Sequence, residues 1–188
     1  MTETSYNSDE ILNFRDVGLF VNLIASKPIM LENKILRGGK IKFTEEAALA
    51  ALTYPPTIIN LRNSKDPDVP GVKNFHFPTS KNLDKYNTAD RNVRRWLNRV
   101  LATLCLSTTR YPILVHCNSG KDRTGVVIAS LLKILDIPNE IIIDEYLLSD
   151  GHINKDWIKH SLEMIGNPKD YFDQVDFENI FKSFSLPN

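Results

Sequence analysis

The most constraining feature of this sequence is the stretch from Tyr111 to Leu135, which reads YPILVHCNSGKDRTGVVIASLLKIL. Pro112–His116 is a short β-rich run, and Gly125–Leu135 is a longer apolar run with the length of a buried helix. A polar loop that contains one glycine and one of the chain's two cysteines lies between them. A buried strand that leads through such a loop into a buried helix is typical of an α/β sheet.

Strands and helices are also predicted to alternate elsewhere in the chain. The clearest helix lies between Asp90 and Leu106, where apolar side chains share one face and the arginines fall largely elsewhere. The alternation predicts an α/β domain with a central, largely parallel, twisted sheet that is flanked by helices on both faces. The other predicted strands are Thr57–Leu61 and Phe75–Phe77, the other predicted helices are Phe43–Leu52, Pro138–Leu148 and Asn154–Ile165, and Ile11–Gly18 is predicted to be a strand end or turn.

The composition and the N-terminus limit the class of protein. Residues 1–10 are predicted to be a flexible lead-in, and residues 11–188 contain no linker or repeat, so they are expected to form a single domain. The formal net charge is zero, which gives no overall basic field for nucleic acid. No apolar run is long enough for a transmembrane segment, and the polar, acidic start does not resemble a signal peptide. We therefore expect a cytoplasmic protein with reduced thiols, while export without a cleaved signal stays open.

The loop after His116 has the properties of a phosphate site. The N-terminus of the following helix directs N–H groups and a partial positive charge at the loop. Gly120 allows backbone conformations that other residues avoid, and Arg123 offers two parallel hydrogen bonds to phosphate oxygens. We name residues 117–124 the phosphate loop.

Cys117 opens the phosphate loop and is the predicted nucleophile. A helix N-terminus and neighbouring cations favour the thiolate, which is the reactive form of cysteine. Attack by sulfur on a bound phosphate would give a phosphocysteine that water then hydrolyses. Backbone amides and arginine can stabilise the charge of the transition state, so no metal and no cofactor is expected. The other cysteine, Cys105, falls on the apolar side of its predicted helix and is expected to be a core residue.

The segment HCNSGKDRT, at His116–Thr124, matches the His-Cys-x5-Arg-Ser/Thr signature of the cysteine-dependent protein tyrosine phosphatase superfamily, which the sequence resembles. The resemblance implies that Cys117 is the nucleophile and that Arg123 clamps the phosphate. It implies further that Thr124 stabilises the departing thiolate and that His116 orients the loop. The remaining phosphate-binding positions that it implies are Asn118, Ser119, Gly120 and Lys121.

Within this superfamily, the chain looks like the bacterial-type atypical phosphatases, which act on phosphotyrosine, phosphoserine/threonine and phosphoinositides. Four further segments resemble theirs, and the atypical enzymes that cleave inositol pyrophosphates have a similar loop and start. The resemblance implies a phosphorylated protein, a lipid headgroup or an inositol phosphate as substrate. The segments are NFRDVG (Asn13–Gly18), ILRGGKI (Ile35–Ile41), IINLRNSKD (Ile58–Asp66) and IIIDEYLLS (Ile141–Ser149).

The general acid is less certain from sequence than the nucleophile. Many superfamily members carry this aspartate on a Trp-Pro-Asp loop, and the chain contains no such tripeptide. Asp122, inside the phosphate loop, is the favoured candidate, and Asp84 and Asp90 remain alternatives. Lys121 either binds an additional phosphate of the substrate or is solvated. Arg15, Asp16, Arg37 and Arg62 are expected to form a structural network behind the site.

Two other functions are weighed against a phosphatase. A rhodanese-like sulfurtransferase also uses a cysteine after a strand, but its loop is typically shorter and lacks the five-residue spacing between Cys117 and Arg123. A non-catalytic phosphate-binding module would usually have lost one of these two residues. The histidines His76, His152 and His160 show no spacing typical of metal ligands.

Overall fold

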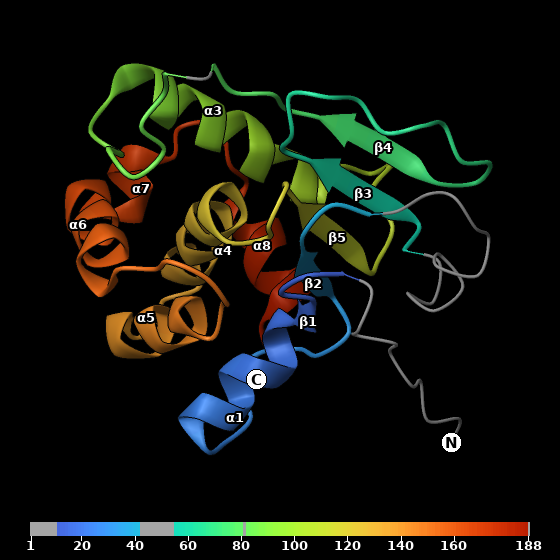
Figure 1. The fold of residues 1–188 in the computed structure, drawn as a ribbon. Coiled ribbons are helices and arrows are strands. Elements are labelled where there is room, and N and C mark those ends of the chain that lie inside the picture. The colour runs from blue at the N-terminus through green and yellow to red at the C-terminus, as the bar shows by residue number, and fades with distance from the viewer. Residues whose placement is uncertain (1–10, 42–54, 81, 188) are drawn as a thin grey trace.

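The computed structural model describes residues 11–41, 55–80 and 82–187. They include a five-stranded sheet with the order β1-β2-β5-β3-β4 (Figure 1). Strands β1 and β2 are antiparallel, whereas β2, β5, β3 and β4 run parallel to one another. The predicted largely parallel sheet is therefore confirmed. The strands are β1 (Arg15–Asp16), β2 (Ile35–Gly38), β3 (Thr57–Asn60), β4 (Lys73–His76) and β5 (Ile113–His116).

The described residues form seven α-helices and one short 3-10 helix, Thr103–Cys105. The four helices predicted after residue 90 are confirmed, with α5 beginning one residue after Pro138 and α6 capped by Asn154. The predicted helix Phe43–Leu52 lies outside the described residues. The α-helices are α1 (Val17–Ala25), α3 (Arg91–Ala102), α4 (Asp122–Ile134), α5 (Asn139–Leu147), α6 (Lys155–Ile165), α7 (Pro168–Tyr171) and α8 (Phe177–Phe184).

The segment Ile11–Gly18 was only partly predicted. Arg15 and Asp16 do form a strand, but helix α1 begins immediately after it. The Asp16 carboxylate caps this helix by accepting a hydrogen bond of 3.0 Å from the Gly18 N–H group. Burial raises the pKa of this carboxyl, and hydrogen bonds from the backbone of Asn33 and Gly18 oppose the shift.

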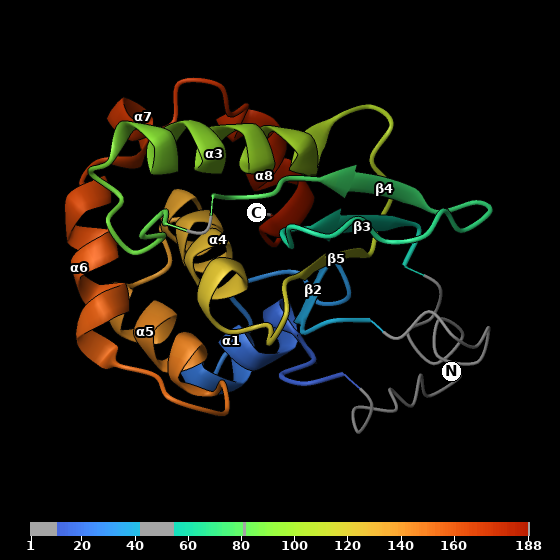
Figure 2. The ribbon, with the colours of Figure 1, turned by 45° about the horizontal axis from the view of Figure 1, so that its top comes forward.

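The sheet separates two groups of buried side chains. Alternate strand residues, such as Ile113 and Val115, join a large core to which all seven described α-helices contribute. Helices α4, α5 and α6 all lie to the left of the strands in Figure 2. On the opposite face, Leu114 packs in a smaller group with Ile11 and Ile41. In the described residues the helices therefore cover one face and connecting segments cover the other, so the predicted cover of both faces by helices is seen there on one face alone.

Helix α4 lies at the centre of the large core. Residues 124–132 are all buried, and the helix packs against α3, α5 and α6. The N-terminus of α4 therefore has a fixed position relative to the end of the central strand β5.

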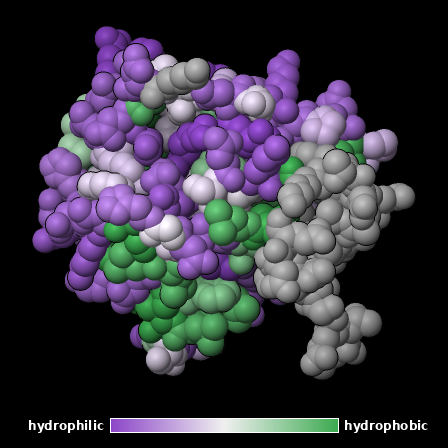
Figure 3. All heavy atoms as spheres, viewed as in Figure 1, coloured by the Kyte–Doolittle hydropathy of each residue, from purple (hydrophilic) through white to green (hydrophobic). Residues whose placement is uncertain are grey.

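The face shown in Figure 3 is mostly polar, and its largest group of apolar side chains lies over α1, where Leu19 and Leu23 are exposed. Among the helices of the described residues, none combines the length and the apolar character that a membrane crossing requires.

Replacement of Leu97 tests the core that holds α3. Leu97 is fully buried, so Leu97→Ala is expected to lower the free energy of unfolding by about 2–5 kcal/mol, because it removes buried methyl groups and leaves a cavity. Leu106, which is 45% exposed, provides the control, and Leu106→Ala is expected to change stability by less than about 0.5 kcal/mol. Urea unfolding measures both values, and equal losses would contradict the assignment of the core.

Candidate active site

The phosphate loop connects the central strand β5 to helix α4. Cys117 follows the last residue of β5 and is 2% exposed, and α4 begins at Asp122. The loop therefore lies at the carboxyl end of a parallel sheet and at a helix N-terminus, which is where α/β proteins bind anions. Of the predicted phosphate-binding residues, Asn118–Lys121 lie between the strand and the helix, and Thr124 lies in the first turn of α4.

Three consecutive carbonyl groups of the phosphate loop accept hydrogen bonds from residues near the N-terminal end of the described chain. Within the described residues, no backbone N–H group from residue 118 to residue 121 donates to a backbone acceptor. Carbonyls that are held outward leave the N–H groups free to face a bound phosphate. The bonds run from Lys40 N to Asn118 O (2.9 Å), from Asn13 Nδ2 to Ser119 O (2.7 Å) and from an Arg37 terminal nitrogen to Gly120 O (2.8 Å).

Gly120 is required at the turn of the loop. Its φ angle is +70°, and a Cβ atom there would lie 2.4 Å from the carbonyl carbon of Gly38. No side chain fits at that distance from a backbone atom, and a left-handed conformation is unfavourable for most residues. Two separate features therefore require glycine here: the positive φ angle and the close approach of the Gly38 backbone.

A buried network of charges holds Arg37 in place. Arg37 is fully buried and pairs with Glu145 at 2.6 Å, and Glu145 also pairs with Arg15 at 2.8 Å. Ser149 accepts hydrogen bonds from both arginines. Burial lowers the pKa of Arg37 to about 10, while attraction to Glu145 opposes that shift, so the guanidinium stays charged near neutral pH. Of the four residues expected to form a network behind the site, Arg15 and Arg37 do so, whereas Asp16 caps α1 and Arg62 binds Asp66 and Asn118.

A second network surrounds His116. Its Nε2 atom lies 2.7 Å from the Asp66 carboxylate, and Arg62 binds the same carboxylate at 3.2 Å. Arg62 also donates to the Asn118 side chain at 3.0 Å. Sequence reasoning gave no role to Asp66; its signal was the four-residue spacing from Arg62 on the turn after β3.

Arg123 is held at the rim of the loop. Its guanidinium donates to the Leu61 carbonyl at 2.7 Å, and the Leu61 N–H group donates to the His116 carbonyl at 2.9 Å. The arginine therefore lies against the strand end that leads into Cys117. Thr124 is fully buried, and its hydroxyl has no hydrogen-bond partner within the part of the chain that the structure describes.

A family model described as the tyrosine phosphatase family matches residues 6–183 of this sequence. The chain belongs to the tyrosine phosphatase family. PtpB of Mycobacterium tuberculosis, named a triple specificity protein phosphatase, is 37% identical over 60 residues, or 32% of this chain and 21% of PtpB. The inositol diphosphatase DSP4 of Arabidopsis thaliana is 28% identical over 124 residues, or 62% of this chain and 60% of DSP4. The matches thus span less than two thirds of either relative.

Two solved structures share the fold of this chain. The core catalytic domain of the PP-IP phosphatase SIW14 from S. cerevisiae superposes with a TM-score of 0.55 and 19% identity, covering 90% of this chain and 91% of that one. TpbA of P. aeruginosa gives a TM-score of 0.50 and 20% identity, covering 79% and 84% of the two chains.

The three candidate general acids of this family member differ in their partners. Asp90 caps α3 and accepts hydrogen bonds from two of its N–H groups, at 2.6 Å and 3.4 Å. Asp84 accepts a hydrogen bond of 3.0 Å from the Tyr86 N–H group. Asp122 stands at the start of α4 and accepts a hydrogen bond of 2.7 Å from the Tyr86 hydroxyl. Of the three, Asp122 alone belongs to the phosphate loop, at the N-terminus of α4, and it stays the favoured candidate.

A cavity of about 400 Å³ opens beside Asp122. Lys121, at its edge, donates a hydrogen bond of 2.7 Å to the His152 carbonyl and lies 3.9 Å from the Asp122 carboxylate. Among the residues described, no group of three or more His, Cys, Asp or Glu side chains is arranged to hold a metal ion. The cavity is lined by Asp84, Lys85, Tyr86, Lys121, Asp122, His152 and Trp157.

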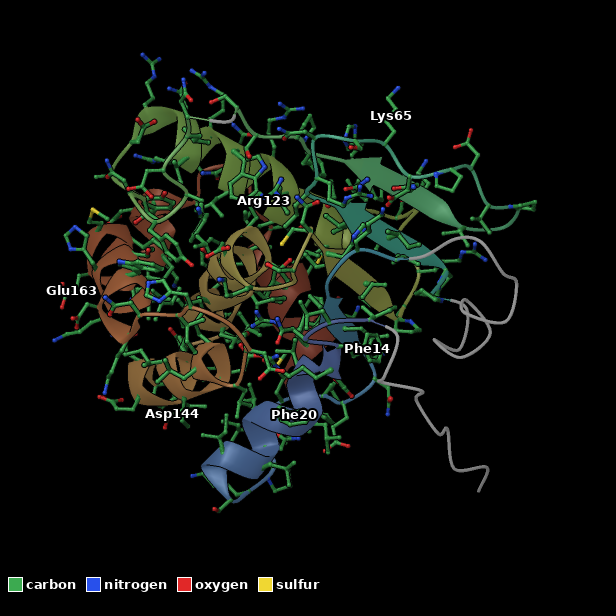
Figure 4. All side chains as sticks on the ribbon, in the orientation of Figure 1. Phe14, Phe20, Lys65, Arg123, Asp144 and Glu163 are labelled. Atoms are coloured by element: carbon green, nitrogen blue, oxygen red, sulfur yellow. The ribbon has the colours of Figure 1, made fainter. Side chains whose placement is uncertain are left out.

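Glu145→Gln tests the support of the phosphate loop. The change leaves two arginines buried against a neutral side chain, so we expect the free energy of unfolding to fall by about 3–5 kcal/mol. Urea unfolding of the purified variant measures the loss. The matched control is Glu163→Gln on the outer side of α6, where Glu163 is 58% exposed and contacts Lys159 at 4.0 Å (Figure 4). A control loss above about 1 kcal/mol, or no loss in Glu145→Gln, would contradict this account.

Proposed function

We propose that this chain hydrolyses phosphate monoesters through a covalent phosphocysteine. The observation that carries the proposal is the phosphate loop itself, with Cys117 at its base, Arg123 at its rim and three carbonyls held outward. Free N–H groups and a guanidinium then surround a phosphate directly above the sulfur. Such donors stabilise the charge on the equatorial oxygens of the transferring phosphoryl group.

In the first step, the Cys117 thiolate attacks phosphorus and forms an S–P bond. The P–O bond to the leaving group breaks, and the Asp122 carboxylic acid transfers its proton to the leaving oxygen. The products of this step are a free alcohol or phenol, a phosphocysteine and the Asp122 carboxylate.

In the second step, water attacks the phosphocysteine and Asp122 takes up one of its protons. The S–P bond breaks, and the electron pair returns to sulfur as the thiolate. The buried Thr124 hydroxyl, which lacks another partner within the described residues, is the donor that we assign to the departing sulfur. Inorganic phosphate leaves, and the enzyme regains its starting state.

We infer that the substrate is a phosphotyrosine protein, with dual specificity open, or a phosphoinositide. Tyr86 and Trp157 give the cavity beside Asp122 aromatic walls, and Lys85 and Lys121 add positive charge. A second cavity of about 640 Å³ shares Asp84, Tyr86 and Trp157 with it, which leaves room for groups beyond the scissile phosphate. The name of PtpB, a triple specificity phosphatase, is consistent with this range of substrates.

The second candidate is an inositol pyrophosphate or polyphosphate. It is favoured by the similarity to the inositol diphosphatase DSP4 and to the PP-IP phosphatase SIW14. The two lysines of the cavity suit a substrate with several phosphates.

Cys117→Ser tests the nucleophile. We expect this variant to lose hydrolysis of p-nitrophenyl phosphate by at least about 10⁴-fold, because a serine hydroxyl at this position is not ionised at neutral pH. Cys105→Ser is the control, since Cys105 lies near Ser183 (3.8 Å) at the other end of the core, and it is expected to keep full activity. Acid quench of the wild type with ³²P-labelled substrate should trap label on Cys117. Full activity in Cys117→Ser would rule out the proposed chemistry.

A substrate panel separates the two candidates. We expect the highest kcat/KM for phosphotyrosine peptides or phosphoinositides, and a decrease of about tenfold in Lys121→Gln for phosphoinositides, since one charge-assisted contact is lost. Lys182→Gln, a change of an exposed lysine on α8 outside both cavities, is the control. A higher kcat/KM for inositol pyrophosphates than for every other compound would favour the second candidate instead.

A further inference from the structure

A chain of three side chains links the core to the candidate general acid. The Tyr86 hydroxyl donates to Asp122 Oδ1 at 2.7 Å, and the hydroxyl oxygens of Tyr86 and Tyr146 lie 2.8 Å apart. Tyr86 belongs to the segment between β4 and α3, whereas Asp122 and Tyr146 belong to α4 and α5. No motif of the sequence predicted that these residues meet.

The hydrogen bonds of this chain have one direction. A carboxylate only accepts, so Tyr86 uses its single hydroxyl proton on Asp122. Tyr146 must then donate to Tyr86. Burial raises the pKa of Tyr86, and its bonds with Tyr146 and Asp122 raise it further; burial also raises the pKa of Tyr146. Both hydroxyls therefore keep their protons at neutral pH and remain donors.

Packing fixes the position of Tyr146, the innermost of the three hydrogen-bonded side chains. Tyr146 is fully buried, and a Cβ atom at Gly125 would lie only 2.8 Å from its ring, so the glycine allows the ring to lie against α4. Tyr86 contacts Tyr146 edge to face, with ring centroids 6.3 Å apart, and its other neighbour is Trp157 at 5.4 Å. The Tyr86 hydroxyl thus has little freedom to leave Asp122.

The two oxygens of the Asp122 carboxylate are not equivalent. Oδ1 accepts the bond from Tyr86, whereas the polar contact of Oδ2 in the described residues is Lys121, at 3.9 Å. A carboxylate that is anchored through one oxygen presents the other in a defined direction. Proton transfer requires such alignment, because the acid must lie within hydrogen-bond reach of the leaving oxygen.

We propose that Tyr86, backed by Tyr146, is a positioning residue that anchors Oδ1 of Asp122 and leaves Oδ2 to exchange a proton with the leaving group and with water. This inference rests on the proposed function, in which Asp122 is the acid and base. It extends the reacting machinery to two tyrosines that do not touch the phosphate.

Tyr86→Phe removes one oxygen atom and tests the proposal. General acids contribute about 10²–10⁴-fold, so a misplaced one is expected to lower kcat/KM for phenyl phosphate, which reports formation of the phosphocysteine and not its hydrolysis, by about tenfold or more. The decrease for p-nitrophenyl phosphate is expected to be much smaller, because p-nitrophenolate leaves with little help from an acid. Tyr146→Phe keeps the bond from Tyr86 to Asp122. It is expected to lower the rate with phenyl phosphate more than the rate with p-nitrophenyl phosphate, but by a smaller factor than Tyr86→Phe.

Tyr171→Phe is the matched control. Tyr171 is 6% exposed against 9% for Tyr86, and its hydroxyl also donates at 2.7 Å, to the Thr88 carbonyl. The control loses a similar hydrogen bond, but it is expected to leave the ratio of the two substrate rates unchanged. Thermal unfolding of all variants shows how much each hydroxyl contributes to stability. Should Tyr86→Phe fail to fold, Tyr146→Phe provides the same test.

The decisive comparison uses the Asp122→Asn background. If Tyr86 acts through Asp122, adding Tyr86→Phe to Asp122→Asn causes no further loss with phenyl phosphate. A further loss equal to that of Tyr86→Phe alone, or equal losses for both substrates, would overturn the proposal. A wild-type rate in Asp122→Asn would instead show that Asp122 is not the acid. Full activity in Cys117→Ser would show that the proposed function itself is wrong.

Discussion

The rest of the site depends on three hydrogen bonds that hold the consecutive carbonyls of Asn118, Ser119 and Gly120 outward. A backbone N–H group is aimed by its own peptide plane, so holding the carbonyl of each peptide outward directs the next N–H group inward. One of the three donors is a buried guanidinium, Arg37, which is stable there only because Glu145 compensates its charge. The geometry of the phosphate site is therefore set by a charge pair that does not itself face the phosphate.

Helix α5 supports both halves of the proposed reaction with two consecutive residues. Glu145 faces the arginines of β1 and β2 and so fixes the phosphate loop, whereas Tyr146 faces α4 and begins the hydroxyl chain to Asp122. Successive residues on a helix point about 100° apart, so one turn of α5 can contact both the arginines of β1 and β2 and the helix α4. A shift of α5 would therefore disturb the phosphate loop and the acid together, which couples binding of phosphate to proton transfer.

The strand, loop and helix around Cys117 were predictable because their signals are local: a β-rich run, a glycine and a long apolar run. Helix α1 was not, since Val17–Ala25 is apolar on most of its surface and follows a two-residue strand without a break. The partners Asp66 and Tyr86 were missed for another reason. Each meets its site residue across a sequence separation of 50 or 36 residues, and such contacts leave no periodic pattern in the chain.

The four segments outside the phosphate loop that resemble those of the atypical phosphatases gain a physical meaning from this arrangement. Each contributes side chains or backbone to the surroundings of one loop, and none has a function alone. A buried network that lacks one member leaves a charge or a donor unsatisfied, so its parts stabilise the fold only as a complete set. Segments that are spread over more than a hundred residues therefore belong to one site and identify it together. Asn13 and Arg15 come from the first segment, Arg37 and Lys40 from the second, Arg62 and Asp66 from the third, and Glu145, Tyr146 and Ser149 from the fourth.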